Sequence, residues 1–63
     1  MLQVTFVGTA VDRSCNHILL IVSAVGNNLE TLKEGVWETI YKECELQNLE
    51  LLDGPRIIVT DLN

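Results

Sequence analysis

Basic residues are scarce in this sequence. Four Lys and Arg residues stand against nine Asp and Glu residues, and the formal net charge at pH 7 is −5. Nucleic-acid binding depends on clustered basic side chains that neutralise phosphates, and attachment to an anionic membrane surface depends on them too. We therefore expect neither partner. The negative charge is compatible with binding to a basic protein surface, although an acidic surface also simply keeps a small protein soluble.

Cysteine is scarce as well, with only Cys15 and Cys44. A secreted disulfide scaffold usually has four or more cysteines, so we expect two free thiols in a reducing compartment, with Cys44 acting as a small core residue. A zinc site needs four ligands, and the single histidine, His17, is the only further soft ligand. The sequence predicts neither a metal nor another cofactor.

Long apolar runs and common catalytic motifs are absent. The longest apolar run, residues 18–25, is far shorter than the roughly 20 residues that span a bilayer. Met1 precedes an alternating pattern, which is not the pattern of a secretory signal. There is no phosphate-binding glycine motif, no serine nucleophile elbow and no HExxH. We expect a soluble, cytoplasmic protein.

The chain has 63 residues, which is near the lower limit for independent folding. A domain of this size buries only about 60% of the surface of its unfolded chain, and apolar burial must nearly cancel an ordering cost of about 1.5 kcal/mol per residue. No linker, repeat or low-complexity segment divides the sequence. Residues 1–63 are therefore expected to form one small domain that needs a partner subunit, because disulfides and metals are disfavoured.

Two apolar segments near the start of the chain predict a β-hairpin. Residues 2–11 are rich in β-branched side chains and partly alternate between apolar and polar. Residues 17–25 contain an unbroken apolar run, which is typical of a strand buried on both faces. Gly8 weakens the first strand and is expected to mark a bulge or a close backbone approach. The polar residues 12–16 between the segments form the predicted turn.

Residues 29 to 47 have the spacing of an amphipathic helix. Its apolar stripe consists of Leu29, Leu32, Val36, Ile40 and Cys44. Trp37 and Tyr41 flank this stripe as a second ridge, while charged side chains occupy the opposite side. Gly35 costs about 1 kcal/mol relative to alanine in a helix, so we expect it to permit close packing of a neighbouring backbone.

Both ends of this helix have capping signals. Asn27 or Asn28 can cap the first turn, and Glu30 lies three residues after Asn27, as in a capping box. The helix is expected to end near Gln47 or Asn48, where asparagine can adopt the left-handed conformation.

The remaining residues predict at least one more strand. Residues 53–56 have the composition of a turn, and residues 56–62 contain a second unbroken apolar run. Residues 49–52 form either a short strand or an extended apolar approach. The sequence therefore predicts a small α+β unit, β-β-α-β(β), in which one helix lies on one face of a three- or four-stranded sheet.

One helix leaves the other face of such a sheet uncovered. Residues 18–22 and 57–59 place apolar side chains on both faces, and soluble monomers rarely expose apolar patches beyond a few hundred Å². We therefore expect oligomerisation to complete the fold, by packing sheet on sheet or by pairing edge strands, with a homodimer as the commonest form. A different protein is the alternative partner. The expected interface residues are Trp37, Tyr41, Ile18, Leu20 and Ile58.

The segment DRSCNH, residues 12–17, holds most of the reactive side chains. Cys15 and His17 with Asp12 have the composition of a nucleophilic site, because an imidazole can deprotonate a thiol. Arg13 can hold an anionic group of a substrate. Asp, Ser and Asn are also ordinary turn formers, because their side chains bond to nearby backbone groups. We prefer the turn interpretation.

No specific activity can be read from these residues. The leading hypothesis is a small homo-oligomeric accessory or regulatory protein that acts through protein contacts. The alternative is a small oligomeric enzyme or anionic-ligand-binding protein that uses the 12–17 loop at a junction between subunits, where a cleft can form.

Overall fold

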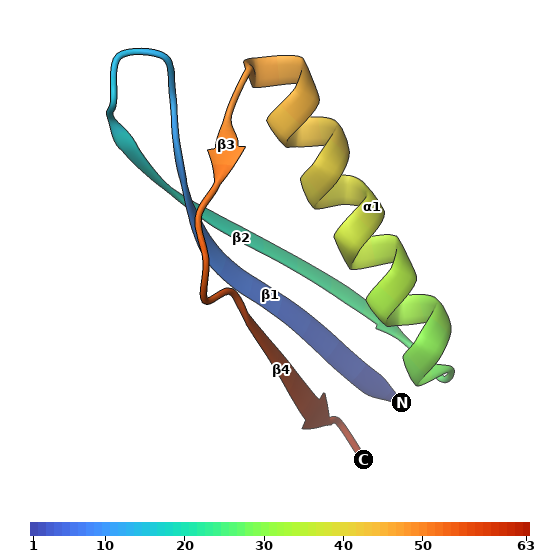
Figure 1. Cartoon of the computed structure of the whole chain (residues 1–63). Coiled ribbons are helices and arrows are strands. Elements are labelled where there is room, and N and C mark those ends of the chain that lie inside the picture. The colour runs from blue at the N-terminus through green and yellow to red at the C-terminus, as the bar shows by residue number, and fades with distance from the viewer.

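A computed structural model describes residues 1–63 as one helix packed on a four-stranded antiparallel sheet (Figure 1). The elements in chain order are β1 (Leu2–Val11), β2 (His17–Gly26), α1 (Leu29–Gln47), β3 (Glu50–Leu51) and β4 (Arg56–Asp61). The order β-β-α-β-β confirms the small α+β unit predicted from the sequence, with the optional short strand present as β3.

The first strand of the chain is the central strand of the sheet. β1 pairs with β2 along its whole length, from Leu2 opposite Gly26 to Val11 opposite His17, without a bulge. On its other edge β1 pairs with β4 over residues 2–7 and with β3 at residues 10 and 11. β2 and β4 are both antiparallel to β1, so they run parallel to each other on either side of it, and α1 makes the crossover between them.

The core lies between α1 and alternate residues of β1. Val4, Phe6 and Ala10 point towards the helix and are fully buried. The helix contributes one side chain per turn to the same layer, and these are Leu32, Val36, Ile40 and Cys44. This is the apolar stripe predicted from helical spacing. Only eight of the 63 residues are buried, so the core is small even for a chain of this length.

Both ends of α1 are capped by asparagine. The side chain of Asn28 accepts a hydrogen bond of 3.1 Å from the Thr31 backbone N–H, which satisfies one of the free donors of the first turn. With Asn28 as the cap, the third helical residue is Thr31, and the capping box predicted with Glu30 is therefore not formed. Asn48 ends the helix in the left-handed conformation, with φ 54°, as predicted.

The glycines of β1 and α1 have opposite surroundings. A β-carbon on Gly8 would lie 2.8 Å from Cε1 of the buried Phe6 ring, so the ring packs against Gly8 in space that a larger residue would fill. The bulge or close backbone approach expected at Gly8 is not found: the register is continuous, and the nearest atoms belong to the Phe6 side chain. The close packing expected at Gly35 is wrong, because a β-carbon on that residue would meet no atom within 4 Å and the residue is on the exposed side of the helix.

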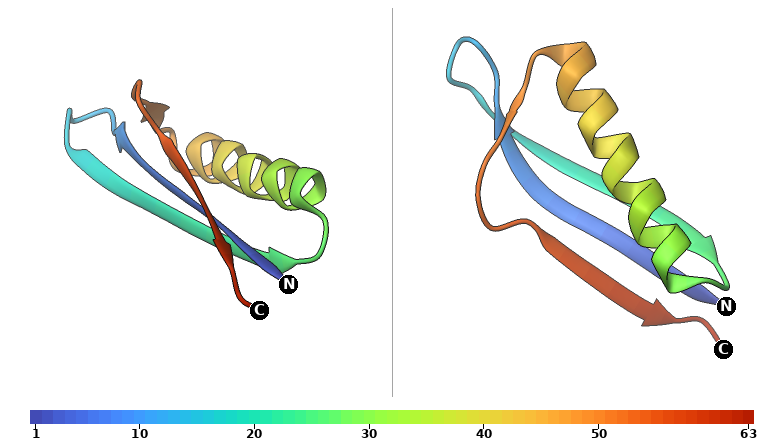
Figure 2. Two further views of the ribbon diagram at one scale, coloured as in Figure 1. Left: turned by 90° about the horizontal axis from the view of Figure 1, so that it is seen from below. Right: turned by 45° about the vertical axis from the view of Figure 1, so that its right-hand side comes forward.

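The helix lies over β1 and β2 and leaves β4 beside it (Figure 2). Val59 on β4 is 46% exposed, although the register places it on the same face of the sheet as Val4. The helix is therefore a narrow cover even for the face on which it packs. The α1 helix does not combine the length and the apolar character that are needed to cross a membrane.

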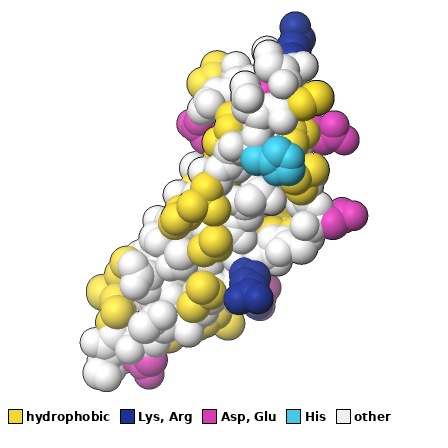
Figure 3. All heavy atoms as spheres, turned by 90° about the vertical axis from the view of Figure 1, so that its left-hand side faces the viewer, with side chains coloured by type: hydrophobic (Ala, Val, Ile, Leu, Met, Phe, Trp, Pro, Cys, Tyr) yellow, Lys and Arg dark blue, Asp and Glu magenta, His cyan; other side chains and the backbone are white.

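The face of the sheet opposite α1 is uncovered, and we call it the open face (Figure 3). The register places on it Gln3, Thr5, Val7, Thr9 and Val11 of β1, His17, Leu19, Ile21, Ser23 and Val25 of β2, Glu50 of β3, and Arg56, Ile58 and Thr60 of β4. Apolar side chains run along its middle, with the single histidine near one end. The two-sided burial predicted for residues 17–25 is thus not achieved within one chain.

Replacing Gly8 with alanine should destabilise the fold through contact with Phe6. Overpacking of this kind costs about 1–3 kcal/mol, which exceeds the roughly 0.5–1 kcal/mol by which alanine is favoured over glycine in a strand. The matched control is Gly35→Ala, which meets open space and should raise the free energy of unfolding by about 0.5–1 kcal/mol. Urea unfolding of both variants tests this. A Gly8→Ala variant as stable as the parent chain would contradict the packing of Phe6 against Gly8.

Candidate functional site

The open face is the larger of two candidate regions, and its centre is apolar. Leu19 and Ile21 on β2 are 62% and 58% exposed, and Ile58 on β4 is 47% exposed. Val7 lies between Ile21 and Arg56 in the register, at the middle of the central strand. Thr5 and Ser23 are directly opposite each other on β1 and β2, and their hydroxyl groups hydrogen-bond at 2.9 Å.

The predicted interface residues are divided among three places. Ile58 lies on the open face, whereas Ile18 and Leu20 lie on the helix side of β2, where both are half-buried. Leu20 packs against the core. Trp37 and Tyr41 lie on the flank of α1, so the sequence-based set does not form one surface.

The aromatic side chains of α1 continue the core outward. The Trp37 ring meets the Phe6 ring edge to face, with centroids 5.1 Å apart and an angle of 74°. Tyr41 stacks on the outer side of Trp37 at 5.6 Å and 29°, and it is 61% exposed. A shallow depression of about 520 Å³ follows this ridge, and its other lining side chains are all Lys or Glu.

Sequence reasoning missed the main open-face residues of β2, which are Leu19, Ile21 and Val25. The apolar run of β2 does not alternate with polar residues, so the sequence does not show which side chains share a face. The missing signal was the register of the hairpin. With a loop over residues 12–16, Val11 pairs with His17, and the odd-numbered residues of both strands then share a face.

The second candidate region is the loop between β1 and β2. Its backbone closes through two hydrogen bonds of 3.1 Å, from the Asp12 N–H to the Asn16 carbonyl and from the Cys15 N–H to the Asp12 carbonyl. Cys15 has φ 63°, in the left-handed region. The backbone is therefore not extended at Cys15, whereas residues two apart point to the same side only in an extended chain.

The Asp12 carboxylate is occupied by the loop itself. Its Oδ1 accepts from the backbone N–H groups of Ser14 and Asn16, both at 2.9 Å, and its Oδ2 accepts from Asn16 Nδ2 at 3.1 Å. The bond from the Asn16 backbone has the largest effect in holding the pKa of Asp12 below its ordinary value, because these donors favour the ionised form. Asp12 thus acts as an Asx-turn residue.

Arg13 joins the loop to the end of α1. One guanidinium nitrogen donates to Asn48 Oδ1 at 3.4 Å, across 35 positions of sequence. The last turn of α1 has no basic residue of its own, and a positive charge near a helix C-terminus interacts favourably with the helix dipole. The structure therefore assigns Arg13 a contact within the chain.

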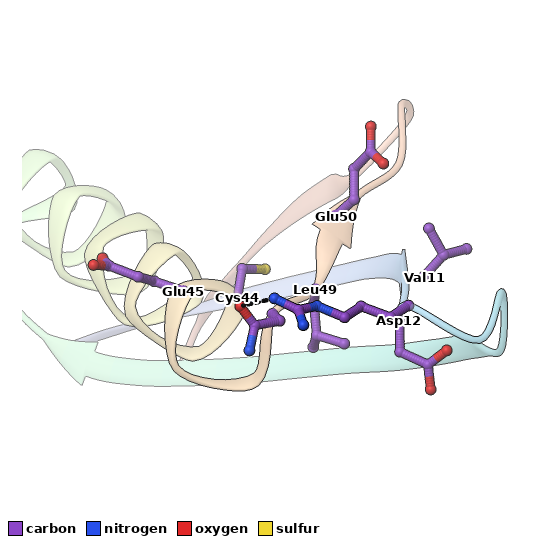
Figure 4. A pocket seen from close by; sticks show the side chains of 8 residues that line it. Val11, Asp12, Cys44, Glu45, Leu49 and Glu50 are labelled. Atoms are coloured by element: carbon purple, nitrogen blue, oxygen red, sulfur yellow. Dashed lines mark hydrogen bonds between the residues drawn. The ribbon is translucent and has the colours of Figure 1, made fainter.

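A depression of about 450 Å³ lies beside the loop (Figure 4). It is lined by Val11, Asp12, Arg13, Cys44, Glu45, Asn48, Leu49 and Glu50. The carboxylates of Asp12, Glu45 and Glu50 point away from one another, so they do not converge on a ligand. No group of three or more His, Cys, Asp or Glu side chains is arranged to hold a metal ion. Cys15 is an exposed free thiol and Cys44 a buried one.

Comparison of the chain with protein-family models, curated proteins and solved structures finds no match.

Replacing Asp12 with alanine should destabilise the protein at neutral pH and have less effect in acid. The loop hydrogen bonds need the ionised carboxylate, so their contribution is fully present above the ordinary pKa of 3.8 and is lost as the pH falls through the lower folded-state pKa. Urea unfolding of both chains at neutral pH and at several values below 3.8 should show the difference shrinking. The control is Asp53→Ala, because Asp53 is exposed in the turn between β3 and β4. A difference that is the same at every pH would rule out this role of the carboxylate.

Proposed function

We propose that this chain is a small accessory or regulatory protein of the cytoplasm that acts through protein contacts and works as a homodimer or higher homo-oligomer. The observation that carries the proposal is the open face, where large apolar side chains such as Leu19, Ile21 and Ile58 remain about half exposed or more. Exposed apolar patches of this kind are typical of surfaces that contact other proteins. The free thiols of Cys15 and Cys44 are compatible with a reducing compartment.

The size of the core supports the same proposal. Eight buried residues provide little apolar burial to offset the entropy of ordering 63 residues. Association with a second chain would add apolar burial without changing the fold of either chain.

The exposed side of α1 is a second candidate contact surface, and it is acidic rather than apolar. It carries five glutamates, Glu30, Glu34, Glu38, Glu43 and Glu45, against Lys33 and Lys42. Glu38 and Lys42 form an ion pair at 3.3 Å, which leaves an excess of negative charge. A basic surface on another protein is the partner that this side would attract.

The alternative, an enzyme or an anion-binding protein that uses the 12–17 loop, has less support. Asp12 is occupied by the turn and Arg13 by Asn48. Two of the four residues of this hypothesis thus have partners within the chain, and a site would have to break those contacts.

The double variant Cys15→Ala, His17→Ala and the response of the parent chain to phosphate together test the loop. We expect the same oligomeric mass and a free energy of unfolding within about 0.5 kcal/mol of the parent chain, as for ordinary surface positions. We also expect no thermal stabilisation of the parent chain by inorganic phosphate. Phosphate-dependent stabilisation that disappears in Arg13→Ala would instead favour the loop as an anion site.

The proposed oligomer should be visible in solution mass. Light scattering or sedimentation should give at least twice the chain mass of 7.0 kDa, with a decrease towards that mass on dilution from about 100 μM to about 1 μM because association is concentration-dependent. A mass of 7.0 kDa throughout, with cooperative thermal unfolding, would contradict the proposal.

A further inference from the structure

We propose that the open face is covered by a second copy of this chain, packed sheet against sheet about a two-fold axis, with both helices on the outside. This inference rests on the proposed function and names the surface and partner of its self-association. It differs from the other arrangement open to a homodimer, in which edge strands pair and the flank of α1 lies at the contact.

The distribution of charge favours the open face for contact between two copies. Its only fixed charges are those of Arg56, opposite Val7, and Glu50, opposite Val11. They sum to zero, so the net charge of −5 lies on the rest of the chain. The acidic side chains seen from this side lie around the rim and at the loop (Figure 3). Two copies can therefore meet through this face without bringing their net charges together, because the acidic helices then point apart.

The hydroxyl groups of Thr5 and Ser23 do not oppose burial of the face. A hydroxyl group that loses water without gaining a hydrogen bond is costly to bury. Thr5 and Ser23 already bond to each other at 2.9 Å across the β1–β2 pair. Their neighbours along β1 and β2 on this face are Val7, Ile21 and Val25, together with Gln3 at the end.

The area of the face is near the lower limit for a specific contact. A strand of ten residues is about 33 Å long and three strands are about 14 Å wide, so the face covers about 450 Å² of flat area. If each face is treated as flat, a pair of chains buries on the order of 900 Å² in total. This is close to the roughly 1,000 Å² buried in the smallest specific interfaces. This area indicates a reversible dimer rather than an obligate one.

The flank of α1 beside β4 is the competing surface, and its charge disfavours a second copy. Tyr41 and Val59 are exposed there, but the depression along Tyr41 is also lined by Glu34, Glu38 and Glu45. Two copies meeting through this flank would bring their acidic helices together. Like charges that face each other across a contact oppose association, so this flank is better suited to a basic partner.

A charge on the exposed edge strand tests which surface is used. Ile21→Lys places an ammonium group on the open face, where the single chain tolerates it because the side chain is exposed. We expect the dissociation constant of the dimer to rise at least about 100-fold, because symmetry buries two unpaired charges. Leu46→Lys is the matched control, since Leu46 is 78% exposed on α1, and its dimer should be unchanged. Circular dichroism checks that both variants keep the fold.

A pair of opposite charges tests the two-fold arrangement. Val7 is at the middle of the central strand. A two-fold axis that lies between the two sheets and passes through the centre of the face therefore brings Val7 of one copy close to Val7 of the other. Val7→Lys and Val7→Glu should each be monomeric, and an equimolar mixture should form a heterodimer through the ion pair. If either variant fails to fold, the Ile21→Lys result decides.

The outcomes separate this inference from the proposed function. A parent dimer that is lost in Ile21→Lys and kept in Leu46→Lys supports the inference. A parent dimer that persists in Ile21→Lys, or that is lost in Tyr41→Lys instead, overturns the inference while self-association stands. A parent chain that is monomeric at all concentrations overturns both. Folded Val7 variants that stay monomeric when mixed overturn the two-fold placement.

Discussion

The contact between α1 and β1 is the interaction on which the rest of the structure depends. Val4 and Phe6 on the strand and Val36 and Ile40 on the helix are the largest fully buried side chains. Because β1 lies between β2 and the C-terminal strands, burying its alternate residues also positions both edges of the sheet. Gly8 leaves room for the Phe6 ring, and the Trp37 ring packs on that ring in a T-shaped arrangement. These aromatic contacts thus link the centre of the sheet to the surface of the helix.

A sheet has two faces, and this chain provides one helix. The helix side is acidic outside and apolar beneath, whereas the open face is apolar with charges that cancel. Contact through the open face and contact through the acidic helix would use different forces, since burial of apolar area dominates the first and charge attraction the second. The two surfaces are on opposite sides of the molecule, so a dimer through one would leave the other free.

Most of the fold could be predicted from local patterns. The helical spacing of Leu32, Val36 and Ile40 and the alternation of β1 depend only on neighbouring residues, and both were predicted correctly. The positions of Ile18 and Leu20 depend on which face of β2 meets the helix, and an unbroken apolar run does not carry that information. Gly35 was misjudged although helical phase alone places it with the polar residues, away from Val36.

The loop shows the same division between local and long-range information. The sequence predicted that residues 12–16 form a turn, because Asp, Ser and Asn are turn formers. It did not predict that Asp12 accepts three hydrogen bonds, which requires the actual path of the backbone. The contact between Arg13 and Asn48 joins residues that are far apart in sequence, and no local pattern specifies such a pair.

The central position of β1 also bears on the order in which the chain assembles. β1, β2 and α1 follow one another in sequence and form contacts between neighbouring elements, which close quickly and at low entropic cost. β4 has to return across nearly the whole chain to reach β1, with Asp61 paired to Leu2, and α1 does not lie over it. We therefore expect the hairpin and helix to form first, and the C-terminal strand to be the last element to join the sheet and the first to leave it when the structure opens locally.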